Sequence, residues 1–238
     1  MTLVMRARPV TTAVLLLGAA LAAWIVTVQR MRGMDAGPGT DLGGLGWFLG
    51  IWVTMTAAMM LPSAAPMVLA YAHFSRSRRV GAFVAGYFVA WTLYGLAAYG
   101  IYRLLVGARL GWQSGGEYVA GAAIAAAGLY QLTPLKESCL RRCRGPLGHL
   151  VRGWREGRTG ALRMGAEHGF VCVGCCWGLM LALFALGVMS LFWTVLVAAA
   201  IFAEKVLPRG DRIARFLSPG LLALAVVVVL APSIRMGP

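Results

Sequence analysis

The residues best suited to chemistry lie close together in the segment Glu167–Met180, which reads EHGFVCVGCCWGLM. It contains an imidazole at His168 and thiols at Cys172, Cys175 and Cys176. Since each helical residue advances about 100°, these four side chains fall within an arc of roughly 100° on one helix face. Imidazole and thiol groups are ligands for soft or borderline metals such as copper(I) and zinc. The spacing therefore predicts a metal or redox site.

Further donors lie elsewhere in the chain. Cys139 and Cys143 are four residues apart and share a face if a helix continues through them, which leaves open a zinc-type pair or ordinary packing. Met59 and Met60 offer thioethers, although methionine in an apolar helix is more often a core residue. Glu204 is a candidate hard ligand, proton acceptor or ion-pair partner for an imidazole or guanidinium. The candidate metal ligands are His168, Cys172, Cys175, Cys176, Cys139, Cys143, Glu204, Met59 and Met60.

Four neighbouring residues have simpler interpretations. Lys205 follows Glu204 and is expected to snorkel toward a membrane interface. Glu167 is expected to be interfacial and solvated, and Gly174 and Gly178 are expected to form a small-residue packing face.

The elements that must position these residues are membrane helices, according to the composition. Of the 238 residues, 60% are hydrophobic and only 13% are charged, whereas soluble domains carry about 25% charged residues. The net charge of +14 comes from residues between apolar runs, so it indicates membrane topology and not nucleic-acid binding. Five clustered cysteines are too few for a secreted disulfide framework.

The apolar runs predict one all-α domain over residues 1–238, a polytopic transmembrane bundle of about seven spans. The first run is long enough to span and precedes no small-residue cleavage site, so we interpret it as an uncleaved helix. A break at Gly187–Ser190 divides the longest apolar run. The predicted spans are residues 10–28, 47–72, 80–106, 118–135, 168–188, 191–207 and 213–230.

The distribution of basic residues predicts the orientation. With the N-terminus cytoplasmic and the C-terminus outside, most of the 22 Lys and Arg residues fall on the inner side, in agreement with the positive-inside rule. The exceptions are Arg30, Arg32, Arg103, Arg109 and Arg235. This topology brings all the cysteines and Glu204 into the inner half of the bilayer.

Two prolines interrupt the predicted second span. Pro62 and Pro66 cannot donate to the carbonyls of Ala58 and Pro62, so the helix is expected to kink or open there. One interpretation is a bent helix that lines a cavity beside the cysteine segment. The other is an ordinary proline kink whose carbonyls are satisfied by Ser63 or a neighbour.

Several long segments resemble a known family. The runs MMLPSAAPM, GYFVAWTLYG, YQLTPLKESCLRRCR, EHGFVCVGCCWGLM and LFWTVLVAAAIFAEKVLP are similar to the bacterial predicted metal-binding integral membrane proteins, domain of unknown function 2182. The resemblance covers roughly residues 46–208. It implies a metal and adds weight to the Cys, His168 and Glu204 positions, but it supplies neither the metal nor a reaction.

Three functions are compatible with these features. The leading hypothesis is a protein of the bacterial inner membrane that binds a metal ion, with copper favoured and zinc possible, in transport, delivery or metalloenzyme assembly. Its expected partners are the lipid bilayer and a membrane metalloenzyme or metallochaperone, and no nucleic acid. The alternatives are a membrane thiol redox protein using Cys172 and Cys175, or an accessory subunit of a larger membrane complex. No catalytic residue is assigned, and the sequence leaves the oligomeric state open.

Overall fold

A computed structural model describes residues 2–32, 41–75, 77–108, 116–145, 148, 150 and 153–230, without the side chains of 2–9, 77 and 78. The described residues form eight helices and no strand, which confirms the predicted all-α class. Arg109, Arg235 and the predicted outer C-terminus lie outside the described residues. The helices are α1 (Thr2–Met31), α2 (Leu45–Phe74), α3 (Ser77–Gly107), α4 (Gly116–Tyr130), α5 (Pro134–Arg144), α7 (Gly157–Gly187), α8 (Leu191–Val206) and α9 (Gly210–Leu230).

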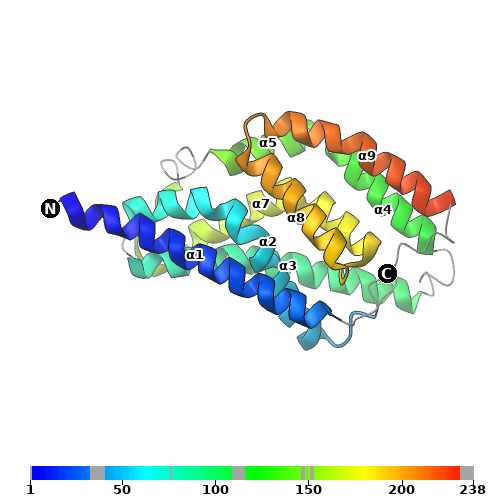
Figure 1. Ribbon diagram of the computed structural model, residues 1–238, viewed down its shortest axis with the longest axis horizontal. Helices are drawn as coiled ribbons and strands as arrows, with labels where there is room; N and C mark the ends of the chain where they lie inside the picture. Colours follow the sequence, from blue (N-terminus) through cyan, green and yellow to red (C-terminus); the bar gives the residue numbers. More distant parts are fainter. Residues whose placement is uncertain are drawn as a thin grey trace.

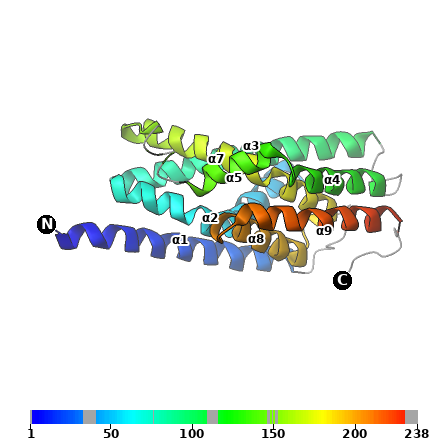
Figure 2. The same ribbon diagram turned by 90° about the horizontal axis from the view of Figure 1, so that it is seen from above.

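The helices run roughly along the long axis of the molecule (Figure 1). In both views α1 packs along α2, and α4 packs along α9 (Figures 1 and 2). Five helices of the described chain are long and apolar enough to cross a membrane: α1 from Val10, α2, α3 from Arg79, α7 and α9. The α4–α5 pair is a sixth candidate if its two bent segments form one span. With 16 residues, α8 is shorter than the roughly 20 that a span requires. The number seven and the orientation therefore stay predictions.

Glycines allow α3 and α7 to pack closely. A Cβ atom added to Gly86 would lie 1.9 Å from the carbonyl oxygen of Leu162. A Cβ atom added to Gly165 would lie equally close to the carbonyl oxygen of Phe83. Backbones that approach this closely favour glycine at the contact, as in other helix pairs with small-residue faces. This packing fixes the position of α7 in the bundle.

The predicted fourth span, residues 118–135, is wrong in its last turn. α4 ends at Tyr130 and α5 begins at Pro134, with a bend of 67° between them. Thr133 is the N-cap of α5, and its hydroxyl accepts a hydrogen bond from the backbone N–H of Lys136 at 3.2 Å. Proline at the first helical position after such a cap starts a new helix. The helix then continues through both Cys139 and Cys143.

The start of α7 also differs from the prediction, and α2 differs at its prolines. α7 begins at Gly157, before the predicted start at residue 168, because its polar first turns are also helical. It ends at Gly187, where a φ of +108° suits glycine, as expected from the predicted break. α2 does not open at its prolines, since it is helical from Leu45 to Phe74.

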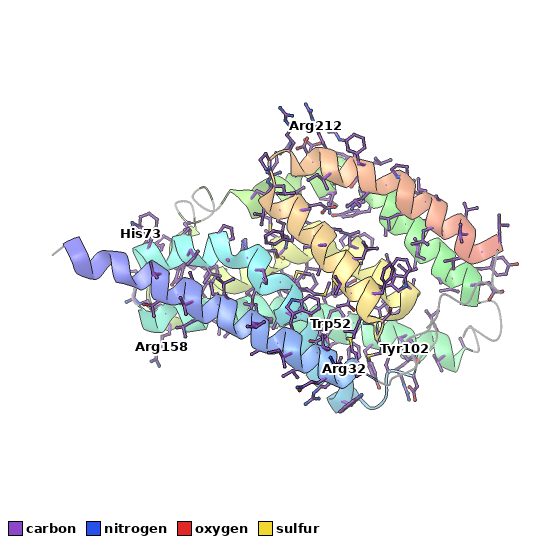
Figure 3. All side chains as sticks on the ribbon, viewed as in Figure 1. Arg32, Trp52, His73, Tyr102, Arg158 and Arg212 are labelled. Carbon is purple, nitrogen blue, oxygen red and sulfur yellow. The ribbon has the colours of Figure 1, made fainter. Side chains whose placement is uncertain are left out.

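Polar side chains mark the ends of the bundle. Figure 3 shows His73 and Arg158 at the end where α1 begins, whereas Arg32 and Tyr102 lie toward the opposite end. The distribution of basic residues predicts Arg158 on the inner side and Arg32 on the outer side. Arg212 is also predicted on the inner side but lies between these two ends in Figure 3, so the division of the chain stays a prediction.

Candidate metal centre

Three thiols from two helices form a compact cluster. The Sγ atoms of Cys143 on α5 and of Cys172 and Cys175 on α7 all lie within 4.8 Å of one another. Cys172 and Cys175 are fully buried, and Cys143 is partly buried. Cys175 Sγ also donates to the carbonyl oxygen of Cys172 at 3.1 Å. We call Cys143, Cys172 and Cys175 the thiol cluster.

A fourth sulfur adjoins the thiol cluster. Cys176 Sγ lies 3.3 Å from Cys175 Sγ and is buried. Cys139, in contrast, does not join the cluster. Its sulfur lies beside α7 at Gly174, where an added Cβ atom would be 3.0 Å from Cys139 Sγ. Among the described residues, the fold therefore brings four of the five cysteines together and leaves Cys139 one turn of α5 away.

A buried ammonium group contacts the thiol cluster. Lys205 Nζ, on α8, donates to Cys172 Sγ at 2.8 Å and lies 3.4 Å from Ser63 Oγ. The side chain of Lys205 is buried, so the expectation that it snorkels to the interface is wrong. A cation beside a sulfur stabilises the negative charge of a thiolate, and the thiolate is the form that binds metals.

The α2 residues complete this side of the centre. Met60 Sδ lies 4.0 Å from Lys205 Nζ, and Met59 belongs to the same buried core as Cys172. Ser63 donates to the carbonyl oxygen of Met60 at 3.0 Å. Ser63 and Met60 therefore lie near the thiol cluster through Lys205. The bond from Ser63 to a backbone carbonyl agrees with the second interpretation of this segment, and a cavity lined by α2 stays a prediction.

Tyr87 connects the thiol cluster to His168. Its hydroxyl lies 2.9 Å from Cys172 Sγ, and its ring stacks on the imidazole of His168 with centroids 5.9 Å apart. The imidazole also stacks on Phe83 at 6.2 Å. His168 is therefore buried in an aromatic stack one layer from the cluster, and its nitrogens are not among the grouped metal-binding atoms.

Glu204 takes part in a separate buried network. Its Oε2 atom pairs with Lys136 Nζ at 2.6 Å, and its Oε1 atom accepts from Gln131 Nε2 at 2.7 Å. Lys136 Nζ also donates to the carbonyl oxygen of Cys175. The predicted ion pair thus exists, but its partner is a lysine and not His168 or an arginine. This network supports the backbone of α7 directly behind the thiol cluster.

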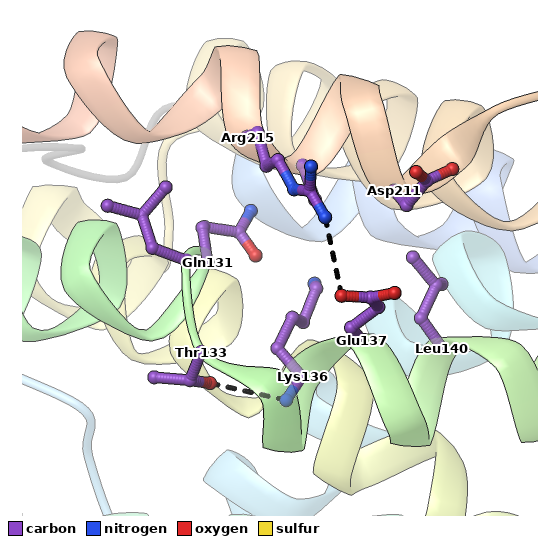
Figure 4. Close-up of a pocket in the computed structure, with 9 residues that line it drawn as sticks. Gln131, Thr133, Lys136, Glu137, Leu140, Asp211 and Arg215 are labelled. Carbon is purple, nitrogen blue, oxygen red and sulfur yellow. Dashed lines mark hydrogen bonds and ion pairs between the residues drawn. The ribbon is translucent and has the colours of Figure 1, made fainter.

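A small polar pocket opens beside this network at the α4–α5 bend. In Figure 4, Lys136 extends from α5 between Gln131 and Glu137, and Arg215 of α9 pairs with Glu137 at 3.4 Å. Its lining residues are Gln131, Leu132, Thr133, Lys136, Glu137, Leu140, Asp211, Ala214 and Arg215. The pocket brings charged groups of α5 and α9 next to the buried ion pair.

The remaining predicted residues behave as expected. Glu167 is half-exposed and pairs with Arg163 at 3.1 Å and with Arg155 at 3.6 Å, in agreement with an interfacial position. Gly174 and Gly178 face α5 and α4, in agreement with their predicted packing role.

The thiol cluster has the chemistry and the dimensions for a soft metal ion. A metal–thiolate bond of about 2.3 Å places the sulfurs of a trigonal site about 4 Å apart. The observed limit of 4.8 Å among the three sulfurs accommodates this arrangement. Sulfur ligands favour copper(I) or zinc over calcium or magnesium.

Sequence reasoning missed Lys136, Tyr87 and the function of Lys205. Lys136 directly follows an apolar segment, and the sequence predicts that it begins a polar stretch. The Thr133-Pro134 pair was an available signal for a helix start, which would have moved Lys136 into a helix. No local pattern indicates the contact between Tyr87 and Cys172, because 85 residues separate them.

The fold and the site define a helical protein with several membrane-compatible helices and a buried thiol cluster that fits a metal ion. A family model described as "PpoB2: Copper chaperone" matches residues 49–228, which include every residue of the thiol cluster and its neighbours Met60, Tyr87, Cys176 and Lys205. The chain belongs to this copper chaperone family. No curated protein matches the sequence, and no solved structure matches it. The family supports the prediction of a metal-binding protein, and its description agrees with copper as the favoured metal.

Proposed function

We propose that this protein is a multi-pass protein of the bacterial inner membrane that binds copper(I) at the thiol cluster and delivers it to a partner. The observation that carries the proposal is the position of three sulfurs, Cys143, Cys172 and Cys175, within 4.8 Å of one another in a copper chaperone family member. Copper here is the cargo and not a fixed cofactor.

The ligand set suits copper(I) for a physical reason. Copper(I) is a soft ion, and thiolate and thioether sulfurs are the protein ligands that select it. Met60 and Cys176 lie near the thiol cluster and supply further sulfurs. Since Cys176 Sγ is 3.3 Å from Cys175 Sγ, the ion has an adjacent sulfur to which it can transfer without leaving the protein.

Delivery requires access from one side of the membrane. The predicted topology places the cysteines in the cytoplasmic half of the bilayer. We therefore propose that copper enters from a cytoplasmic donor and passes to a membrane metalloenzyme or a metallochaperone. Cys143 is the partly buried member of the cluster and lies near the end of α5. It is therefore the thiol through which an incoming ligand would reach the ion.

The proposal is tested by metal content under reducing, oxygen-free conditions. The full chain, purified in detergent and loaded with copper(I), is expected to retain one copper ion per chain. A variant with serine at Cys143, Cys172 and Cys175 is expected to retain none, with unchanged helical circular dichroism. Equal copper content in both proteins would contradict the proposal.

The same preparation distinguishes the thiol redox alternative. Cys172 and Cys175 have neighbouring buried sulfurs, which is also compatible with reversible disulfide formation. A redox protein would oxidise these thiols with a quinone in the presence of a copper chelator. A copper chaperone would not oxidise its thiols in this assay, and bound copper would protect them from alkylation.

Recovery of the protein from native membranes in a stable assembly would favour the accessory-subunit alternative.

A further inference from the structure

Lys205 has an unusual set of partners for a buried lysine. Its ammonium group contacts a sulfur, a hydroxyl and a thioether: Cys172 Sγ at 2.8 Å, Ser63 Oγ at 3.4 Å and Met60 Sδ at 4.0 Å. Among the described residues, no carboxylate oxygen lies within 4.0 Å of it. Its neighbour Glu204 points into the other network, where it pairs with Lys136. The positive charge of Lys205 is therefore directed at the thiol cluster.

A metal ion bound at Cys172 would lie close to this charge. A metal–sulfur bond of about 2.3 Å added to the observed contact of 2.8 Å places the ion within about 5 Å of Lys205 Nζ. The site is buried, so water screens the repulsion between the two cations poorly. Repulsion increases in proportion to the charge of the ion, and a divalent ion experiences twice the repulsion of a monovalent ion.

From this geometry we infer that Lys205 is a specificity-determining residue that selects monovalent copper(I) against divalent ions such as zinc. This inference rests on the proposed function of the thiol cluster and explains how that cluster distinguishes two metals with similar sulfur chemistry. The thiolates attract both ions, but Lys205 offsets part of that attraction, and the offset is larger for zinc.

Removal of the charge should change the ratio of the two affinities. The affinities of the purified full chain for copper(I) and zinc(II) are measured by competition with chelators of known strength. Lys205→Leu is expected to raise the affinity for zinc relative to copper(I) by about 10- to 100-fold, since one unit of repulsion is removed and leucine adds no sulfur ligand. Lys205→Arg retains the charge and is expected to retain the ratio of the unsubstituted protein.

A second variant tests the inference without removing the lysine. Ser63→Asp places a carboxylate beside Lys205 and neutralises its charge, so it is expected to shift the ratio toward zinc by a smaller factor. Ser63→Asn is the matched uncharged control and is expected to leave the ratio unchanged. If Lys205→Leu does not fold, as judged by circular dichroism, the Ser63 pair decides the question.

The outcomes separate this inference from the proposed function. An unchanged ratio in Lys205→Leu or, if that variant is unfolded, in Ser63→Asp overturns the role of Lys205 while cysteine-dependent copper binding still holds. Absence of cysteine-dependent copper(I) binding in the unsubstituted protein overturns both.

Discussion

Two buried lysines contact the cysteine segment of α7 and have different partners. Lys136 forms an ion pair with Glu204 at 2.6 Å, whereas Lys205 contacts Cys172 Sγ at 2.8 Å. An ion pair balances its own charge and gives rigidity, because neither member can lose the other without leaving a buried charge. A lysine opposite thiols is balanced only when a thiol is ionised. The first arrangement is structural, and the second is suited to binding a metal ion.

Adjacent positions in α8 produce both arrangements. Glu204 and Lys205 are consecutive and both buried, but their side chains reach different sides of the helix. In sequence they suggest one self-neutralising pair. In the structure the Glu204 carboxylate pairs with Lys136 of α5, whereas the Lys205 ammonium group contacts the thiol cluster at Cys172. The variants below test whether the two networks are as different as their contacts indicate.

The largest effect is expected in the Lys136 network. Glu204→Ala leaves Lys136 buried without a counter-ion, and loss of one partner of a buried pair costs about 3–5 kcal/mol of stability. Thermal unfolding in detergent, followed by circular dichroism, measures this loss. The double variant Lys136→Met/Glu204→Leu removes both charges and is expected to recover most of it. A cost below about 1 kcal/mol for Glu204→Ala would contradict a structural role.

The next effect concerns the thiol cluster itself. Cys172→Ser removes the sulfur that contacts Cys143, Cys175 and Lys205, so the affinity for copper(I) is expected to fall at least about 100-fold, or roughly 2.7 kcal/mol. Competition with a copper(I) chelator measures the change. Cys139→Ser is the matched control because its sulfur lies outside the cluster, and its affinity should stay within about threefold. Equal losses in the two variants would mean that the fold does not determine which cysteines bind.

A smaller effect is expected at Tyr87. Tyr87→Phe removes the hydroxyl that lies 2.9 Å from Cys172 Sγ but retains the ring stacked on His168. One hydrogen bond contributes about 1 kcal/mol, so copper(I) affinity should weaken about fivefold in the same competition assay. Tyr94→Phe is a suitable control, since its hydroxyl donates to the carbonyl of Trp177 at 3.0 Å and not to a sulfur. A larger loss in Tyr94→Phe would place the important hydroxyl elsewhere.

The smallest effect is expected at the surface. Glu167→Gln removes pairs with Arg155 and Arg163, which are half-exposed or more. Exposed ion pairs contribute about 0–1 kcal/mol, so both the unfolding temperature and copper(I) affinity should be nearly unchanged. A clear loss of copper binding in this variant would contradict this expectation and show that Glu167 contributes to the metal centre.

Much of the centre followed from the sequence because its residues repeat with helical periodicity. The cysteines at 172, 175 and 176 share one helix face, and a stripe of this kind faces the interior in an apolar bundle. The same argument failed to place His168, which lies on that face but one turn earlier and packs between Phe83 and Tyr87. It also could not separate Cys143 from Cys139, because the direction of α5 depends on the bend before Pro134.

The sequence by itself determined the all-helical class, the membrane-compatible apolar runs and the cysteine-rich face of α7. These properties depend on composition and on spacing within single helices, so they do not require knowledge of the neighbours. Only the tertiary structure decided that Cys143 joins Cys172 and Cys175, that Lys136 pairs with Glu204, and that Lys205 faces sulfur. Each of these contacts joins residues of different helices, so it depends on how the helices pack. The packing depends in turn on close backbone contacts, such as the one between Gly165 of α7 and Phe83 of α3.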